Sequence, residues 1–189
     1  MKWSNYLEDT DKVLESFYEG CSEVGPEACP FYAPSPSAIK QNLTALFESL
    51  RVNPIPVQKG DIYGIVDYQA LRKGIFVALY KPYRYFSVLA QGLAELAAGD
   101  GSRLLEVWNE PTFQCPCNSN GDVGRMFEKD ALNTILCNDN AGIPGDLGWA
   151  KGYYDMMLNA SHWADVQASV LIDCASVDLL RIGISTQCV

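Results

Sequence analysis

Hydrophobic residues recur along most of this chain at the three- and four-residue spacing that places them on one face of an α-helix. The pattern is clearest from Tyr83 to Ala98, and it is also present from Asp9 to Cys21 and from Ile39 to Leu50. Further helices are predicted after Asp67, over Ser102–Trp108, over Arg125–Cys137 and after Asp146. The chain is therefore expected to be mainly helical.

Polar and helix-breaking residues mark the ends of these helices. Asp9 or Thr10 is expected to cap the first helix, which Gly25-Pro26 ends. The expected caps of the later helices are Ser35 or Ser37, Asp67, Ser102 and Asp146. The prolines of Asn53-Pro54-Ile55-Pro56 are expected to stop the second helix.

Little of the pattern favours strands. Asp61–Val66 is expected to be a short extended segment, and Val170–Ile172 is the best strand candidate near the carboxyl end. Pro111–Gly124 shows no periodic pattern and is expected to be a loop. The predicted fold class is mainly α, with one or two short strands.

Charge and composition exclude several kinds of function. The 189 residues include 14 basic and 23 acidic side chains, which give a net charge of −9. We therefore expect neither nucleic acid nor a membrane as a partner, because phosphate binding needs a basic surface and no apolar run approaches the roughly 20 residues of a membrane span. His162 is the only histidine, which excludes a histidine-rich metal site.

Cysteines and glycosylation sequons favour an oxidising compartment. There are seven cysteines, and Asn42-Leu43-Thr44 and Asn159-Ala160-Ser161 both match the acceptor pattern for N-linked glycans. The first ten residues contain no apolar run of a signal peptide. An interior piece of a longer secreted protein explains both features. The alternative is a cytosolic protein with free thiols.

Residues that carry chemistry are few. Ser185 lies in the nearest approach to the Gly-x-Ser-x-Gly nucleophile pattern, but the second glycine is missing. Cys115 and Cys117 need two further ligands for a zinc site, and Cys137 is a candidate for only one of them, so disulfides are favoured over metal. His162, with Asp165 three residues later, is expected to be a surface histidine. We predict no catalytic residue, metal or cofactor in this chain.

Four aromatic residues surround the expected break between two helices. They are Tyr80, Tyr83, Tyr85 and Phe86. Core packing is the favoured interpretation, and the lining of a substrate cleft is the alternative.

Several short blocks occur in a familiar order. They are Phe17-Tyr18-Glu19-Gly20-Cys21, Gly25-Pro26-Glu27-Ala28-Cys29-Pro30-Phe31-Tyr32, Tyr63-Gly64-Ile65-Val66-Asp67-Tyr68, Leu93-Ala94-Glu95-Leu96-Ala97-Ala98-Gly99-Asp100-Gly101 and Ile135-Leu136-Cys137-Asn138-Asp139. Over about Trp3 to Cys174, the chain resembles the fungal tripeptidyl-aminopeptidase-like hydrolases, which are secreted α/β-hydrolases of the prolyl-peptidase group. The similar region follows the nucleophile and includes the helical lid.

The resemblance implies a lid without its catalytic centre. In that family the serine lies upstream of the segment corresponding to Trp3, and the aspartate and histidine lie downstream of that corresponding to Cys174. Residues 1–174 are thus expected to be lid-like, with most of the core sheet absent. Residues 175–189 depart from the family pattern, and we expect a poorly ordered tail.

We predict disulfides between Cys21 and Cys29 and between Cys137 and Cys174, with Cys188 unpaired. The second would close a loop of 37 residues and stabilise the fold by roughly 3–4 kcal/mol. The partners of Cys115 and Cys117 stay open.

The expected function is that of an incomplete secreted serine hydrolase fragment, which supplies the substrate-gating lid and is inactive alone. A peptide or a small ester or amide would be the substrate of the parent protein only. The alternative is a non-catalytic, acidic helical binding module. For the lid fragment, the many aromatics predict self-association through exposed apolar surface, whereas the module is expected to be a monodisperse monomer.

Overall fold

The computed structural model describes residues 7–60, 62–108, 135, 137 and 144–176. These residues form seven α-helices, one short 3₁₀ helix and a two-stranded antiparallel sheet, so the predicted mainly helical class is confirmed. The chain divides into two compact units, Asp9–Glu110 and a second one that combines Met1–Glu8 with Pro111–Val189. The predicted region 1–174 thus includes residues of both units.

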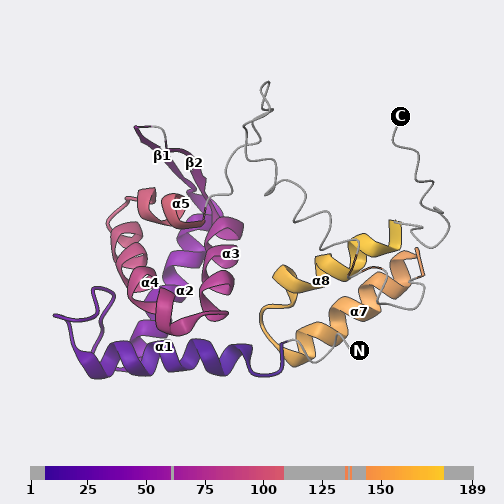
Figure 1. Ribbon diagram of the computed structural model, residues 1–189, viewed down its shortest axis with the longest axis horizontal. Coiled ribbons are helices and arrows are strands. Elements are labelled where there is room, and N and C mark those ends of the chain that lie inside the picture. Colours follow the sequence, from indigo (N-terminus) through magenta and orange to yellow (C-terminus); the bar gives the residue numbers. More distant parts are fainter. Residues whose placement is uncertain (1–6, 61, 109–134, 136, 138–143, 177–189) are drawn as a thin grey trace. The chain divides into compact units, whose positions relative to one another are not determined.

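The unit Asp9–Glu110 is a helical bundle with one hairpin (Figure 1). Its elements are α1 (Thr10–Val24), α2 (Pro36–Val52), β1 (Ile55–Lys59), β2 (Ile62–Val66), α3 (Tyr68–Leu79), α4 (Pro82–Ala97) and α5 (Ser102–Trp108). In Figure 1 the hairpin projects from the bundle on the side opposite α1.

Two of the four predicted capping residues in this unit, Ser35 and Asp67, cap their helices with a side-chain hydrogen bond. Ser35 accepts a hydrogen bond from the backbone N of Ala38 at 3.2 Å, and Asp67 accepts one from that of Ala70 at 2.8 Å. Asp9 precedes α1 but makes no side-chain cap bond. Gly25 ends α1 with a φ of +80°, a conformation that other residues rarely adopt.

The expected cap at Ser102 is wrong. Ser102 is the first residue of α5, and the Asp100 carboxylate accepts a hydrogen bond from its backbone N at 2.8 Å. Asp100, two residues before Ser102, reaches the free backbone amide of the first helical turn and so takes the capping role.

The core of the unit consists of aliphatic side chains from four helices. The predicted helical faces are confirmed: α1 contributes Phe17, Tyr18 and Cys21, and α2, α3 and α4 contribute leucines or isoleucines that are at most 2% exposed. They are Ile39, Leu43, Leu50, Leu71, Ile75, Leu89, Leu93 and Leu96. Burial of this many large side chains is the main force that holds the bundle together.

The hairpin packs one of its faces on the bundle. β1 and β2 pair antiparallel with Val57 opposite Gly64 and Ile55 opposite Val66. Val57 and Val66 are buried, whereas Tyr63 and Ile65 on the other face are 66% and 62% exposed. The prediction of an extended segment ending at Val66 is confirmed for β2, but β1 was expected only to stop a helix.

The second unit contains α7 (Leu147–Ala160), α8 (Ala164–Ile172) and the 3₁₀ helix Asp173–Ser176. Asp146 caps α7 as predicted, by accepting a hydrogen bond from the backbone N of Trp149 at 2.8 Å. In Figure 1 the two helices, in orange and yellow, lie side by side. Met157 and Trp163 are at most 1% exposed.

The strand predicted at Val170–Ile172 is wrong, because these residues end α8. Ala164, Ala168 and Leu171 are the buried residues of this helix, and their spacing is that of one helical face. The preference of Val and Ile for strands is weak beside such packing.

Parts of the prediction lie outside the described residues. Of the helix predicted at Arg125–Cys137, only Ile135 and Cys137 are described, and both are helical. Pro111–Gly124 and residues 177–189 of the tail are not described. No helix within the described ranges is long and apolar enough to cross a membrane.

Candidate functional site

An open groove of about 410 Å³ lies on the unit Asp9–Glu110, between α2, α4 and the segment Pro30–Tyr32. Its lining is largely apolar, and Phe31, Tyr32 and Leu46 supply the large side chains. Ala94 and Ala97 of α4 are small, which leaves room between the helices. Apolar concavities with few polar groups are the usual form of a binding site for a side chain or small ligand.

The Cys21–Cys29 disulfide positions one wall of this groove. The two Cα atoms are 5.3 Å apart, and the bond ties the end of α1 to the residue just before Pro30. Within the loop, Cys29 donates its backbone N–H to the carbonyl of Gly25 at 2.9 Å, and Tyr32 donates to the carbonyl of Cys29 at 3.1 Å. The structure therefore contains the predicted Cys21–Cys29 bond, and this bond fixes the segment that carries Phe31.

Asn42 lies at the rim of the groove. It is exposed on α2, and its side chain belongs to the lining. Thr44, the third residue of the sequon, donates its hydroxyl to the carbonyl of Lys40 at 2.9 Å. Asn159 is exposed near the end of α7, whereas Ser161 of its sequon is 3% exposed. Both predicted acceptor asparagines are accessible to a glycan.

The four aromatics at the helix break divide into two pairs. Tyr83 is fully exposed and Tyr80 is 65% exposed, so core packing was wrong for these two. Tyr85 and Phe86 are half-buried, and the Phe86 ring meets that of Phe17 edge-on at 5.2 Å. None of the four lines the groove. α3 ends at Leu79, and the break at Lys81-Pro82 turns Tyr80 and Tyr83 outward.

A cluster of arginines and aromatic rings joins α2 to α3. The Arg51 guanidinium lies 3.7 Å from the centre of the Tyr68 ring, which meets the Phe47 ring edge-on at 5.5 Å. Arg72 is only 8% exposed and lies 5.7 Å from the Phe47 ring. Arginines stacked on rings stabilise such packing. The sequence did not predict this cluster. The hydrophobic pattern marks only apolar residues, whereas Arg72 is a charged residue on the buried side of α3.

Arg72 also contributes to the electrostatic environment of Tyr18. Burial raises the pKa of the Tyr18 phenol well above its usual range, and the nearby Asp11 and Glu15 carboxylates raise this pKa further. Arg72 acts in the opposite direction and lowers the pKa. Tyr18 is therefore held protonated inside the bundle.

One bidentate ion pair joins α4 to α5. Arg103 donates from Nε and Nη2 to the two carboxylate oxygens of Glu95, each at 2.9 Å, and Gln91 donates to the same carboxylate at 2.8 Å. The hydrogen bonds from Arg103, and then from Gln91, lower the pKa of Glu95. The pair is partly exposed and ties the turn between α4 and α5.

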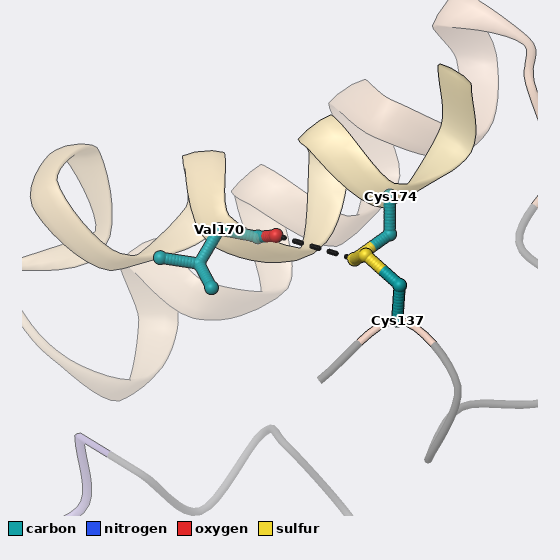
Figure 2. The surroundings of a disulfide bond; sticks show 3 residues. All are labelled: Cys137, Val170 and Cys174. Atoms are coloured by element: carbon teal, nitrogen blue, oxygen red, sulfur yellow. Dashed lines mark hydrogen bonds between the residues drawn. A yellow bond between two sulfur atoms is a disulfide. The ribbon is translucent and has the colours of Figure 1, made fainter. Parts of the chain in front are cut away.

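In the second unit, the predicted pair Cys137–Cys174 is also joined, with Cα atoms 5.2 Å apart (Figure 2). The dashed line in Figure 2 marks 3.5 Å between the Cys174 sulfur and the Val170 carbonyl oxygen. A disulfide sulfur carries no hydrogen, so this is a van der Waals contact while the bond is oxidised. Trp149 and Tyr153, whose rings stack at 5.4 Å, pack against Leu171 and Cys174.

The residues considered for catalysis are only partly described. His162 is exposed two residues before α8, and Asp165 is half-buried in its first turn. Ser185, Cys115, Cys117 and Cys188 lie outside the described residues. Those residues also contain no group of three side chains that would hold a metal ion.

Comparisons with protein families, with curated proteins and with solved structures found no match to this chain.

Proposed function

We propose that this chain is the helical lid of a secreted serine α/β-hydrolase, where it covers the entrance and binds the substrate, and that it has no activity alone. The observation that carries the proposal is the open apolar groove between α2, α4 and Pro30–Tyr32. The core beneath it is complete, with residues such as Leu43 and Leu93 fully buried. The groove therefore lies on the surface of a packed bundle, and its apolar lining is suited to an apolar side chain.

A lid of this kind would contribute to catalysis without touching the reacting atoms. The half-buried Tyr32 and Leu46 would contact an apolar part of a peptide, ester or amide substrate at the entrance, with the buried Phe31 behind them. Covering the entrance excludes water and restricts which substrates enter. The acyl transfer itself would belong to a serine, histidine and aspartate of the parent protein.

Secretion of the parent protein is part of the same proposal. Two pairs of cysteines at disulfide geometry support it, because such bonds persist in oxidising compartments. The exposed Asn159 is compatible with glycosylation there, whereas a glycan on Asn42 would occupy the rim of the groove.

The transcript that encodes this chain tests the lid directly. We expect in-frame coding sequence for a Gly-x-Ser-x-Gly motif upstream and for the aspartate and histidine segments downstream. A complete reading frame without them would contradict the proposal. Purified as it stands, the chain is expected to resist labelling by a fluorophosphonate. Labelling that is lost in Ser185→Ala would show that the chain carries its own nucleophile.

A second candidate is a free-standing acidic binding module, favoured by the complete core of the unit Asp9–Glu110. Hydrophobic dye separates the two candidates. A lid removed from its hydrolase is expected to bind the dye through its uncovered apolar surface, whereas a module is expected to be a monodisperse protein that binds little.

A further inference from the structure

Basic residues are concentrated in one part of this acidic chain. Residues 68–94, which span α3 and most of α4, contain four basic side chains and no acidic one. Arg72 is buried, but Lys73, Lys81 and Arg84 are exposed. None of these three forms an ion pair with a described residue. Three cations therefore remain available on the surface of a protein whose net charge is −9.

Exposed apolar side chains lie among these cations. Val77 is 44% exposed, Tyr80 is 65% exposed and Tyr83 is fully exposed. We call the surface formed by Lys73, Val77, Tyr80, Lys81, Tyr83 and Arg84 the α3–α4 corner. Tyrosine and arginine are the residue types that protein interfaces favour, and the core behind this corner is already closed.

The first helix of the same unit has the complementary charge. Glu15, Glu19 and Glu23 are all exposed and recur every four residues, so they form one row of about 12 Å along α1. Like charges at this spacing destabilise a helix, and no described residue forms an ion pair with any of the three. A basic partner surface would relieve this repulsion.

A glycine lies beside this acidic row. Gly20 lies inside α1, where glycine is less favourable than alanine. Apart from its chain neighbours and the backbone of its own helix, no atom lies within 4 Å of the position that a Cβ would take, so no described neighbour requires a glycine there. The open space next to Glu19 is suited to the flat ring of an incoming tyrosine.

We propose that the α3–α4 corner docks on the acidic row of α1 in a second copy of this chain. The cations of one copy face the glutamates of the other, and Tyr83 lies over Gly20. Charge complementarity of this kind fixes the register of an interface and accelerates its formation. The proposal does not depend on which of the two candidate functions holds.

Charge reversal tests the interface with the full, disulfide-bonded chain. Sedimentation equilibrium at low salt is expected to show self-association of the wild type, weakened at 0.5 M salt by screening. Lys81→Glu with Arg84→Glu is expected to weaken association by about tenfold or more, and Glu15→Lys with Glu19→Lys to do the same. Lys40→Glu with Lys59→Glu, a matched charge change at exposed sites outside both surfaces, is expected to retain association.

Mixing the two reversed variants is the decisive measurement. Neither should associate alone, but a one-to-one mixture should form a heterodimer, because the reversed corner of one variant faces the reversed row of the other. An internal contact within one copy would not produce this result. A wild type that stays monomeric at low salt, a mixture that fails to associate, or a monomer whose corner binds anionic vesicles or acidic peptides instead would overturn the proposal.

Discussion

At the scale of single residues, Tyr18 couples the packing of α1 to pH. Its pKa is raised chiefly by burial, and Asp11 and Glu15 add to the rise. A phenol that holds its proton more tightly in the folded state favours folding below its unfolded pKa of about 10, and this contribution is lost as pH rises above that value.

We therefore predict that Tyr18→Phe reduces the alkaline loss of stability. Above about pH 10 the wild type should lose up to about 1.4 kcal/mol of unfolding free energy per pH unit more than the variant does. Urea unfolding at several pH values measures the difference. Tyr83→Phe, at a fully exposed position, is the control and should follow the wild type. Equal slopes for Tyr18→Phe and wild type would contradict the assignment.

At the scale of elements, Gly101 sets how closely α5 approaches the hairpin. A Cβ at this position would lie 2.6 Å from a methyl group of Val66 and 3.1 Å from one of Val57. Both valines are buried and stiff at χ1, so neither can move aside.

Gly101→Ala is accordingly expected to lower the unfolding free energy by about 1–3 kcal/mol through overpacking. The matched variant Gly20→Ala, where a Cβ has open space, is expected to raise it by about 0.5–1 kcal/mol. Chemical denaturation at high salt, which weakens the proposed charged interface, compares the two. A neutral Gly101→Ala would mean that the hairpin is free to shift from α5.

The two disulfides differ in the length of chain that they close. Cys21–Cys29 spans 8 residues and Cys137–Cys174 spans 37. On the chain-entropy argument, replacing the longer pair by alanines should cost about 3–4 kcal/mol and replacing the shorter pair about 2–3 kcal/mol. The near-ultraviolet signal of Trp149 and Tyr153, which pack against Cys174, reports the loss of the Cys137–Cys174 bond. A larger loss from the shorter pair would contradict the entropic ranking.

The elements also show what the sequence could predict. Helices and their caps at Ser35, Asp67 and Asp146 were predictable, because periodicity and capping are local. β1 was not, since Pro54 and Pro56 mark a helix stop equally well. The Arg103–Glu95 pair was not predictable either, because the two residues meet only through the turn between α4 and α5. The groove needs α2, α4 and a disulfide loop together, which no local pattern encodes.

At the scale of the whole molecule, the division into two units predicts independent folding. The unit Asp9–Glu110 contains its own core and one disulfide. We expect residues 9–110, expressed alone and oxidised, to unfold in one cooperative transition that circular dichroism and tryptophan fluorescence of Trp108 report together. Non-coincident transitions would mean that this core needs the rest of the chain.

The proline in β1 has a consequence for aggregation. Pro56 pairs with Ile65 in a two-stranded sheet. Among the described residues, no further strand covers the outer edges of this sheet. Proline has no N–H to offer, and Lys59 places a charge near the end of the same strand. An incoming strand therefore finds an interrupted row of donors along β1, as in natural sheets that resist edge-to-edge growth. Exposed Tyr63 and Ile65 can thus contact a partner without seeding a cross-β fibril along β1.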